Sequence, residues 1–441
     1  MSKPRRPTAP AIFLTGALLL GAAACSSDNS SGSPNGTNVG SSAGTSVGTT
    51  VGTTVGTTAG TMPMATMDEA ALQALLNEVA PTTMTPGAVA LVRTPAGTVT
   101  ATYGYADLDK SRPVTVDDHV RIGSNTKTFT GTAVLQLVGE GKVALDDPIS
   151  DYVEGVPNGE AITIEMLLDM HSGLYNYTTS PEMNRILDEV PDHVFTPEDL
   201  LALAFAQPPN FAPGAEYEYS NTNTVLLGLV IEKVDGVPVQ EAFATRLFEP
   251  LGLSQTSFPA ATDASIPETH PQGYLYGDNM STIETMALPE ADQPAAESGE
   301  LLPNDVTDEN PSWAFTAGAM ISDLEDLADW AEALAEGELL PPEVQQQRID
   351  SIAPVNPDNP ASPGYGLGIA SFGGFLGHTG ELPGFNSFMA HDPETDTTVV
   401  VWANLANQPD GAAPAVTIAQ ALLKALTGTA DGATPASSAG G

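Results

Sequence analysis

Ser124 and Lys127 stand three positions apart, just before an apolar spacing that predicts a helix over residues 128–138. Residues i and i+3 lie on one face of a helix, so the amine can reach the serine hydroxyl. A serine in the first turn also offers its backbone N–H, supported by the helix dipole, to an oxyanion. The pair predicts a nucleophile for acyl transfer, if burial and neighbours keep Lys127 neutral for part of the cycle. The structural alternative is a helix-capping serine followed by a surface lysine.

Two later segments offer partners for this pair. Tyr219 and Asn221 follow a Pro-Gly pair and precede a strongly apolar stretch, so we expect them on a turn where a helix begins. His378, Thr379 and Gly380 end a predicted strand. Each has a structural alternative: a packed turn aromatic for Tyr219, a helix cap for Asn221 and a structural strand-edge histidine for His378.

Taken in chain order, Ser-x-x-Lys, Tyr-x-Asn and His-Thr-Gly resemble the three motifs of the serine β-lactamase and DD-peptidase superfamily. The Tyr-Ser-Asn and His-Thr-Gly forms are most similar to actinomycete-type D-alanyl-D-alanine carboxypeptidases and class C β-lactamases. The resemblance runs from about Leu72 to Leu426 and includes residues 166–174 and 365–368. It implies an α/β (α+β) fold, in which an antiparallel sheet built from N- and C-terminal segments is flanked by helices and carries an inserted helical lobe.

The resemblance also implies how the motif residues act. Ser124 would attack the substrate carbonyl and form an acyl-enzyme, and Lys127 and Tyr219 would share proton transfer, with either of them as the base. Asn221 would hold Lys127 and the acyl-side amide of the substrate. His378 would tune the site electrostatically.

The third motif would supply the substrate-binding edge. Thr379 and Gly380 would lie along the substrate, with Thr379 on the leaving side. The N–H groups of Ser124 and Glu381 would form the oxyanion hole, and water would release the acyl group. No metal or other cofactor is expected, because His119, His193, His270 and His391 lack metal-ligand spacing. His171 matches a packing corner of the family and is expected to be structural.

The substrate class stays open between several activities. A carboxypeptidase must bind a carboxylate, but no Lys or Arg lies between Arg348 and Lys424, and Glu381 stands where the family tends to place Thr or Ser. Thr379 and a protonated His378 would have to suffice. The lead hypothesis is a D-alanyl-D-alanine carboxypeptidase-like hydrolase of cell-wall peptides. The alternatives are an esterase, a D-aminopeptidase or a β-lactamase on the same fold.

Two other classes of protein are weighed against this hypothesis. The first is a non-catalytic penicillin-binding or cell-wall-binding lipoprotein. Such a protein would not need all three motifs, and the presence of all three argues against it. An α/β-hydrolase would need a G-x-S-x-G elbow around its nucleophile, which the sequence at Ser124 lacks. The expected partner is therefore a small-molecule or peptide substrate, either a cell-wall stem peptide, an ester or a β-lactam.

The elements that must position these residues follow from hydrophobic periodicity. A helix is expected to open the domain after Asp68, followed by a hairpin over residues 87–92 and 98–105. Further helices are expected over residues 164–170, 197–206, 225–234, 324–335 and 414–426. Strands are expected over residues 365–371, 375–380, 385–391 and 398–405. A cleft between the sheet and the helical lobe is the natural place for a site.

The N-terminal 24 residues predict export. Three basic residues precede an apolar stretch at 11–20 that is too short to span a bilayer, and small residues at 21–24 form a cleavage zone. Cys25 follows directly, in a stretch that resembles a permissive lipobox. We therefore expect a lipoprotein signal over residues 1–24, lipidation at Cys25 and a location on the outer face of the cell membrane. Plain secretion is the alternative.

Composition divides the remainder of the chain. Residues 25–65 are mostly Ser, Thr, Gly and Asn, which predicts a disordered stalk. The hydrolase domain is expected over residues 66–427. Residues 428–441 are expected to form a disordered tail. The 14 basic residues face 55 acidic ones, a net charge of −41, which excludes a nucleic-acid surface and leaves the lipid anchor as the only membrane contact. The acidic, Pro-rich residues 261–311 predict a surface excursion.

Overall fold

The computed structural model describes residues 67–428. The predicted signal, the lipidation site at Cys25, the stalk and nearly all of the predicted tail lie outside these residues and stay predictions. Within residues 67–428, no helix combines the length and the apolar run that a membrane span needs.

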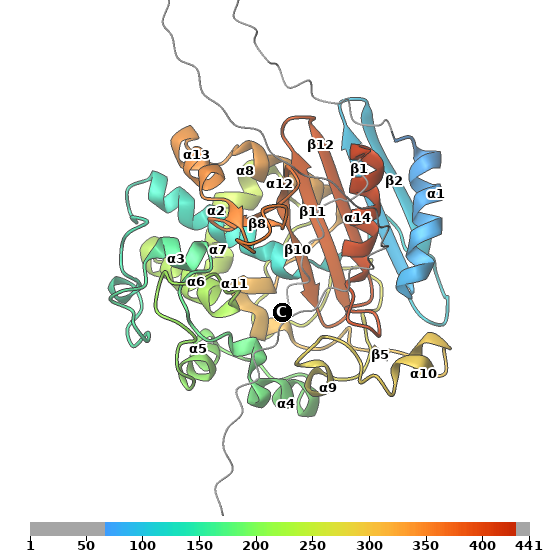
Figure 1. Cartoon of the computed structure of the whole chain (residues 1–441), viewed down its shortest axis with the longest axis horizontal. Coiled ribbons are helices and arrows are strands. Elements are labelled where there is room, and N and C mark those ends of the chain that lie inside the picture. Colours follow the sequence, from blue (N-terminus) through green and yellow to red (C-terminus); the bar gives the residue numbers. More distant parts are fainter. Residues whose placement is uncertain (1–66, 429–441) are drawn as a thin grey trace, which may run out of the picture. The chain divides into compact units, whose positions relative to one another are not determined.

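An eight-stranded antiparallel sheet forms the centre of the fold, in the order β2-β1-β12-β11-β10-β9-β8-β7 (Figure 1). Its N-terminal hairpin pairs with the C-terminal strand β12, with Val89 opposite Trp402. Strands from both ends of the domain therefore share one sheet, which confirms the predicted fold class. The main strands are β1 (Gly87–Thr94), β2 (Gly97–Gly104), β10 (Phe375–Leu382), β11 (Phe385–Asp392) and β12 (Thr397–Ala403), with the shorter β7 (Ala353–Pro354), β8 (Gly364–Gly366) and β9 (Ile369–Phe372) completing it.

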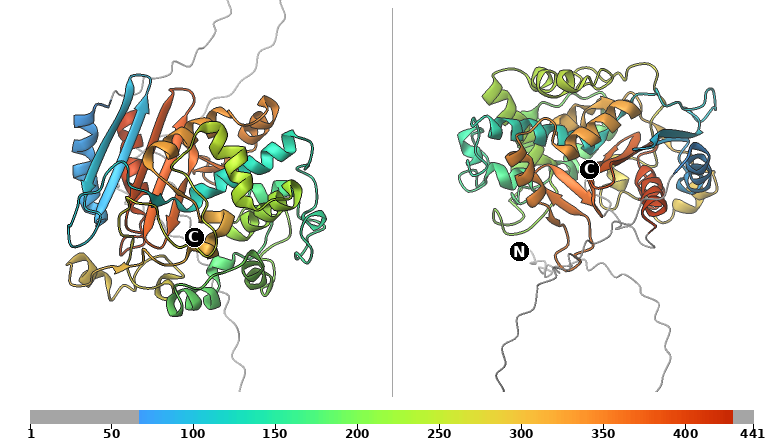
Figure 2. Two further views of the ribbon diagram at one scale, coloured as in Figure 1. Left: turned by 180° about the vertical axis from the view of Figure 1, so that it is seen from behind. Right: turned by 90° about the horizontal axis from the view of Figure 1, so that it is seen from above.

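Helices cover both faces of this sheet (Figure 2). On one face α1 (Glu69–Val79) packs against β2, and α14 (Pro414–Thr427) packs against β11 and β12. On the other face α12 (Leu324–Glu336) crosses β10, β11, β12 and β1. The helix α1 begins where Asp68 caps the N–H of Ala71, and its buried stripe includes Leu72 and Leu76. Burying one such leucine contributes about 2 kcal/mol.

The segment between β2 and β7 forms the predicted inserted lobe of helices. Its central helices are α2 (Thr126–Gly139) and α6 (Asn221–Asp235), which pack against each other and against α11 (Phe315–Gly318). Around them lie α3 (Ile164–Leu168), α4 (Pro181–Glu189), α5 (Pro197–Phe205), α7 (Val239–Phe243), α8 (Glu249–Leu251), α9 (Asn279–Thr282), α10 (Gln293–Glu297) and α13 (Pro342–Asp350).

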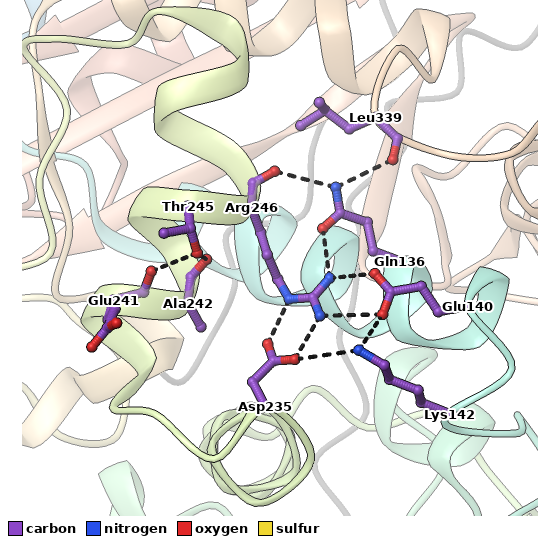
Figure 3. A network of polar contacts seen from close by, with 9 residues as sticks. All are labelled: Gln136, Glu140, Lys142, Asp235, Glu241, Ala242, Thr245, Arg246 and Leu339. Carbon is purple, nitrogen blue, oxygen red and sulfur yellow. Dashed lines mark hydrogen bonds and ion pairs between the residues drawn. The ribbon is translucent and has the colours of Figure 1, made fainter.

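An ion-pair network fastens the C-terminal ends of α2 and α6 to each other (Figure 3). The guanidinium of Arg246, on the π-helical segment η5 (Ala244–Phe248), binds both carboxylate oxygens of Asp235 at 2.5 Å and Glu140 at 2.7 Å. Gln136 donates to the carbonyl oxygens of Arg246 and Leu339. The helix α2 carries Lys127 and α6 begins with Asn221, so the network joins two helices that carry predicted site residues.

Two sequence predictions are wrong in detail. The strand expected over residues 365–371 is instead the hairpin β8–β9, because Gly368 has a φ of +67° and approaches the backbone of Gly131 on α2 too closely for a Cβ atom. The acidic segment 261–311 is not merely a surface excursion. Its Tyr274 is 2 % exposed and pairs with Leu405 beyond β12, so part of the segment belongs to the packed domain.

Candidate active site

Ser124 lies in the 3₁₀ turn η2 (Gly123–Asn125), which leads directly into α2. The turn is locked to the sheet by the Asn125 amide, which donates to Ile122 O at 3.0 Å and to Ser387 Oγ at 2.8 Å. Gly123 has a φ of +54°, and a Cβ atom there would lie 2.4 Å from the backbone nitrogen of Glu381. This contact requires glycine and brings the backbone amide of Glu381 beside the nucleophile.

Lys127 lies one turn along, and its Nζ is 2.8 Å from Ser124 Oγ. The same Nζ donates to the carbonyl oxygen of Ala317 at 2.8 Å. The side chain is buried, and burial holds the pKa of Lys127 well below its usual value. A neutral amine held in this way can accept the serine proton, as the sequence pattern requires.

Tyr219 lies just before α6 and faces the same amine. Lys127 Nζ is 4.8 Å from the centre of the Tyr219 ring, a cation–π distance when the amine is charged. Burial raises the pKa of Tyr219 well above its usual value, and the neighbouring Ser124 offsets part of this effect. Within the described residues, the buried Tyr219 hydroxyl makes no hydrogen bond of regular geometry, although Ser124 lies close enough to lower its pKa. At neutral pH the phenol is protonated and available to donate.

Asn221 begins α6, as predicted, but it contacts other residues than expected. Its amide Nδ2 donates to Thr178 Oγ1 at 3.2 Å, and its backbone N–H donates to Asn176 Oδ1 at 3.1 Å. The hydrogen bonds of Lys127 go to Ser124 and Ala317, so the expected hold of Asn221 on Lys127 is not made. The backbone carbonyl of Ala317 holds Lys127 instead, because α11 packs against α2.

His378 lies on β10, in contact with the aromatic side of the site. Its ring lies 6.1 Å from the Tyr219 ring, and its Nε2 lies 3.4 Å from the Tyr365 hydroxyl. Burial lowers the pKa of His378 to about 3, and Lys127 adds to this effect when it is protonated. The imidazole is therefore neutral at pH 7, and the expectation that a protonated His378 helps to bind a carboxylate is wrong.

The strand that carries His378 also presents Thr379, Gly380 and Glu381. β10 pairs with β9 only from Phe375 to Gly377, so the following residues form an open strand edge beside η2. Gly380 packs so closely on Ile122 O that a Cβ atom would lie 1.9 Å from it, whereas Thr379 is only partly buried. This edge and the turn at Ser124 face each other, as a substrate-binding edge and a nucleophile must.

The half-buried carboxylate of Glu381 adds negative charge at this edge. It accepts a hydrogen bond from Asn407 Nδ2 at 3.0 Å, and burial raises its pKa to about 7. His171 lies outside the site and its Nδ1 contacts Asp169 O at 2.9 Å, in keeping with a structural role. Across residues 67–428, no cluster of His, Cys, Asp and Glu side chains could hold a metal ion.

Sequence reasoning missed three participants. Ala317 acts through its backbone carbonyl, which leaves no trace in residue type. Tyr365 packs edge-on against Tyr219, and the sequence indicates it only through the family resemblance of residues 365–368. Asn407 lies beyond β12 and carries no motif.

The Beta-lactamase family model matches residues 72–423. This chain belongs to that family. Protein flp of Staphylococcus aureus is 28 % identical over 313 residues, which span 69 % of this chain and 56 % of flp, so the chain covers little more than half of that relative. The putative penicillin-binding protein PbpX of Bacillus subtilis is 24 % identical over 69 % of this chain and 67 % of its own length.

Solved structures of the family include amide hydrolases. A D-stereospecific amidohydrolase from Streptomyces sp. shares 33 % identity with a TM-score of 0.69, over 82 % of this chain and 100 % of its own. A D-amino acid amidase from Ochrobactrum anthropi shares 26 % identity with a TM-score of 0.66, over 80 % of this chain and 97 % of its own. The chain therefore has the serine hydrolase fold of the β-lactamase and penicillin-binding protein family.

Proposed function

We propose that this protein hydrolyses amides or esters of D-amino acids through an acyl-enzyme on Ser124. The observation that carries the hydrolase chemistry is the 2.8 Å contact between Lys127 Nζ and Ser124 Oγ in a buried site. Membership of a serine hydrolase family supports the same chemistry.

The geometry supports a two-step reaction. Neutral Lys127 takes the proton of Ser124 as Oγ bonds to the substrate carbonyl carbon, and the backbone N–H groups of Ser124 and Glu381 stabilise the oxyanion. The phenol of Tyr219 then donates its proton to the leaving amine or alkoxide, and the C–N or C–O bond breaks. Tyr219 recovers a proton through Lys127. Water, deprotonated by the same pair, attacks the ester and releases the acid and free Ser124.

Charge at the open strand edge supports amides and esters over carboxylate-ended peptides. His378 is neutral at pH 7, and the cavity that contains Glu381 has no Lys or Arg in its lining. A terminal carboxylate at this edge would meet the Glu381 carboxylate instead of a cation. The names of two structural neighbours point to D-amino acid amides as the substrates.

A D-alanyl-D-alanine carboxypeptidase is the second candidate, because the three motifs are complete and a penicillin-binding protein is among the relatives. One assay series separates the two. We expect D-phenylalanine amide to be hydrolysed at least tenfold faster, in kcat/KM, than its L-enantiomer and than an N-acyl-D-Ala-D-Ala peptide. Ser124→Ala is the control. Preferred turnover of the D-Ala-D-Ala peptide would favour the second candidate, and labelling by fluorescent penicillin without any turnover would favour a binding protein.

A further inference from the structure

Glu381 and Asn407 line the same cavity beside the open edge of β10. Much of the remaining lining comes from residues 178–187 and 275–286 and mixes apolar side chains with Thr and Asn. The apolar side chains are those of Met183, Leu187, Leu275, Ile283, Met286 and Trp313. Such a mixture of apolar side chains and a few polar groups is typical of small-ligand sites.

One buried acceptor in the lining of this cavity lacks a donor among the described residues. Asn407 is 3 % exposed, and among the described residues its Oδ1 has no hydrogen-bond partner. Its Nδ2 donates to Glu381 Oε1, since the ionised carboxylate only accepts, and the free oxygen points away from that bond. For Glu381, Asn407 is the one described side chain that donates to the carboxylate, at Oε1. Buried acceptors without donors are uncommon and call for a ligand or an ordered water.

Among ligand groups, a cation or a neutral N–H or O–H donor fits this acceptor. A primary ammonium has three N–H donors and one positive charge, so it can donate to Asn407 Oδ1 and also pair with the Glu381 carboxylate. An anion would be repelled, since no Lys, Arg or His lines the cavity. The backbone amide of Glu381 lies beside Gly123 in the turn that carries the nucleophile, whereas its side chain lines the cavity, so this residue connects the two.

We propose that Glu381 and Asn407 bind the α-ammonium group of a D-aminoacyl substrate, an inference that rests on the proposed function. The two side chains then hold the residue whose carbonyl is attacked. Substrates with a free amino group are favoured over N-acylated ones, and the preference resides in these two side chains.

The test compares D-phenylalanine amide with N-acetyl-D-phenylalanine amide, which lacks the charge. In the unaltered protein we expect kcat/KM to favour the free amine at least tenfold. Glu381→Gln should reduce this ratio at least tenfold, because the amide keeps the hydrogen bond with Asn407 but loses the charge. Asn407→Leu should reduce it at least threefold. Glu338→Gln removes the same charge from an exposed position away from the cavity and should leave the ratio unchanged.

Calorimetry with D-phenylalanine amide in the Ser124→Ala background measures the subsite without turnover. Adding Glu381→Gln should weaken binding at least fivefold, and thermal melts verify folding of each variant. If neither substrate is hydrolysed, the proposed function fails, and the calorimetry alone decides whether the ammonium subsite exists. If both substrates are hydrolysed and the ratio is the same with Glu381→Gln and Asn407→Leu, the proposed function stands and this inference is overturned.

Discussion

The carbonyl oxygen of Ala317 accepts a hydrogen bond from Lys127 Nζ at 2.8 Å, the same distance that separates this amine from Ser124 Oγ. Ala317 is held by its neighbour Thr316, whose hydroxyl donates to Thr224 O at 2.8 Å and whose carbonyl accepts from Thr130. A rigid backbone acceptor thus aims the amine at Ser124 without adding a negative charge that would favour its protonated form.

Replacing Lys127 tests this arrangement. Lys127→Met keeps the length and the burial but removes the base, so we expect kcat to fall about 10³-fold, within the range of general-base contributions. The measurement is single-turnover acylation with a p-nitrophenyl ester. A loss of less than tenfold would show that Lys127 is not the base.

Replacing Tyr219 should change activity and stability in opposite directions. Tyr219→Phe keeps the ring over Lys127 and removes a buried hydroxyl that makes no hydrogen bond of regular geometry in the described part of the chain. We expect kcat to fall about 10²-fold through loss of the proton donor. The free energy of unfolding should rise by about 1 kcal/mol, because an unsatisfied group is removed. Urea denaturation gives the second quantity, and a drop in stability would mean that the hydroxyl is satisfied in solution.

Glu381 makes stability depend on pH in an unusual direction. Its pKa is raised to about 7 in the folded chain by burial, against 4.5 in the unfolded chain. The folded state therefore binds more protons between these values, so this group's contribution is fully present below pH 4.5 and is lost as pH rises through 7. Relative to Glu381→Gln, the unaltered protein should lose up to about 3 kcal/mol between pH 4.5 and 8. A constant difference in urea denaturation across this range would contradict the shift.

The Arg246 network is expected to stabilise the frame of the site. The side chains of Arg246 and Asp235 are 14 % and 11 % exposed, so Arg246→Gln leaves a mostly buried carboxylate without its partner. We expect a loss of about 2 kcal/mol in the free energy of unfolding. Arg185→Gln is the matched control, because its pair with Glu189 is exposed and should contribute less than about 0.5 kcal/mol.

The stability that this network contributes should depend on pH in the acidic range. Arg246 lowers the pKa of Glu140 to about 2, below its unfolded value of 4.5. The resulting stability is present above pH 4.5 and is lost as pH falls toward 2. The difference between the unaltered protein and Arg246→Gln should therefore shrink over this window. A difference that stays constant down to pH 2 would contradict the role of Glu140.

Export rests on the sequence alone, and we propose that Cys25 carries a lipid. Expressed in a bacterial host, the full chain should incorporate labelled palmitate and sediment with membranes. Cys25→Ser should abolish both. If the unaltered chain were released into the medium without incorporating labelled palmitate, plain secretion would be favoured.

Local sequence patterns were sufficient to predict many of the helices and strands and the motif residues of this protein. Helical spacing placed α2, α6 and α12, strand periodicity placed β10 to β12, and three short motifs in order identified Ser124, Lys127, Tyr219 and His378, which the fold brings together. These features are local because a helix or a strand and its first-turn residues depend on neighbours in sequence. The split of β8 from β9 escaped prediction, because it depends on the approach of Gly368 to a helix more than 200 residues away in the chain.

Tertiary structure alone decided the electrostatics of the site. Whether His378 is charged, which group holds Lys127, and what surrounds Glu381 depend on burial and on contacts between distant segments, such as Lys127 with Ala317 and Glu381 with Asn407. A residue type fixes only the model-compound pKa, whereas desolvation and neighbours fix the charge. The sequence therefore predicted the candidate catalytic residues that the fold brings together, and the packing around them supports the proposal that the open edge of β10 binds a cation and not a carboxylate.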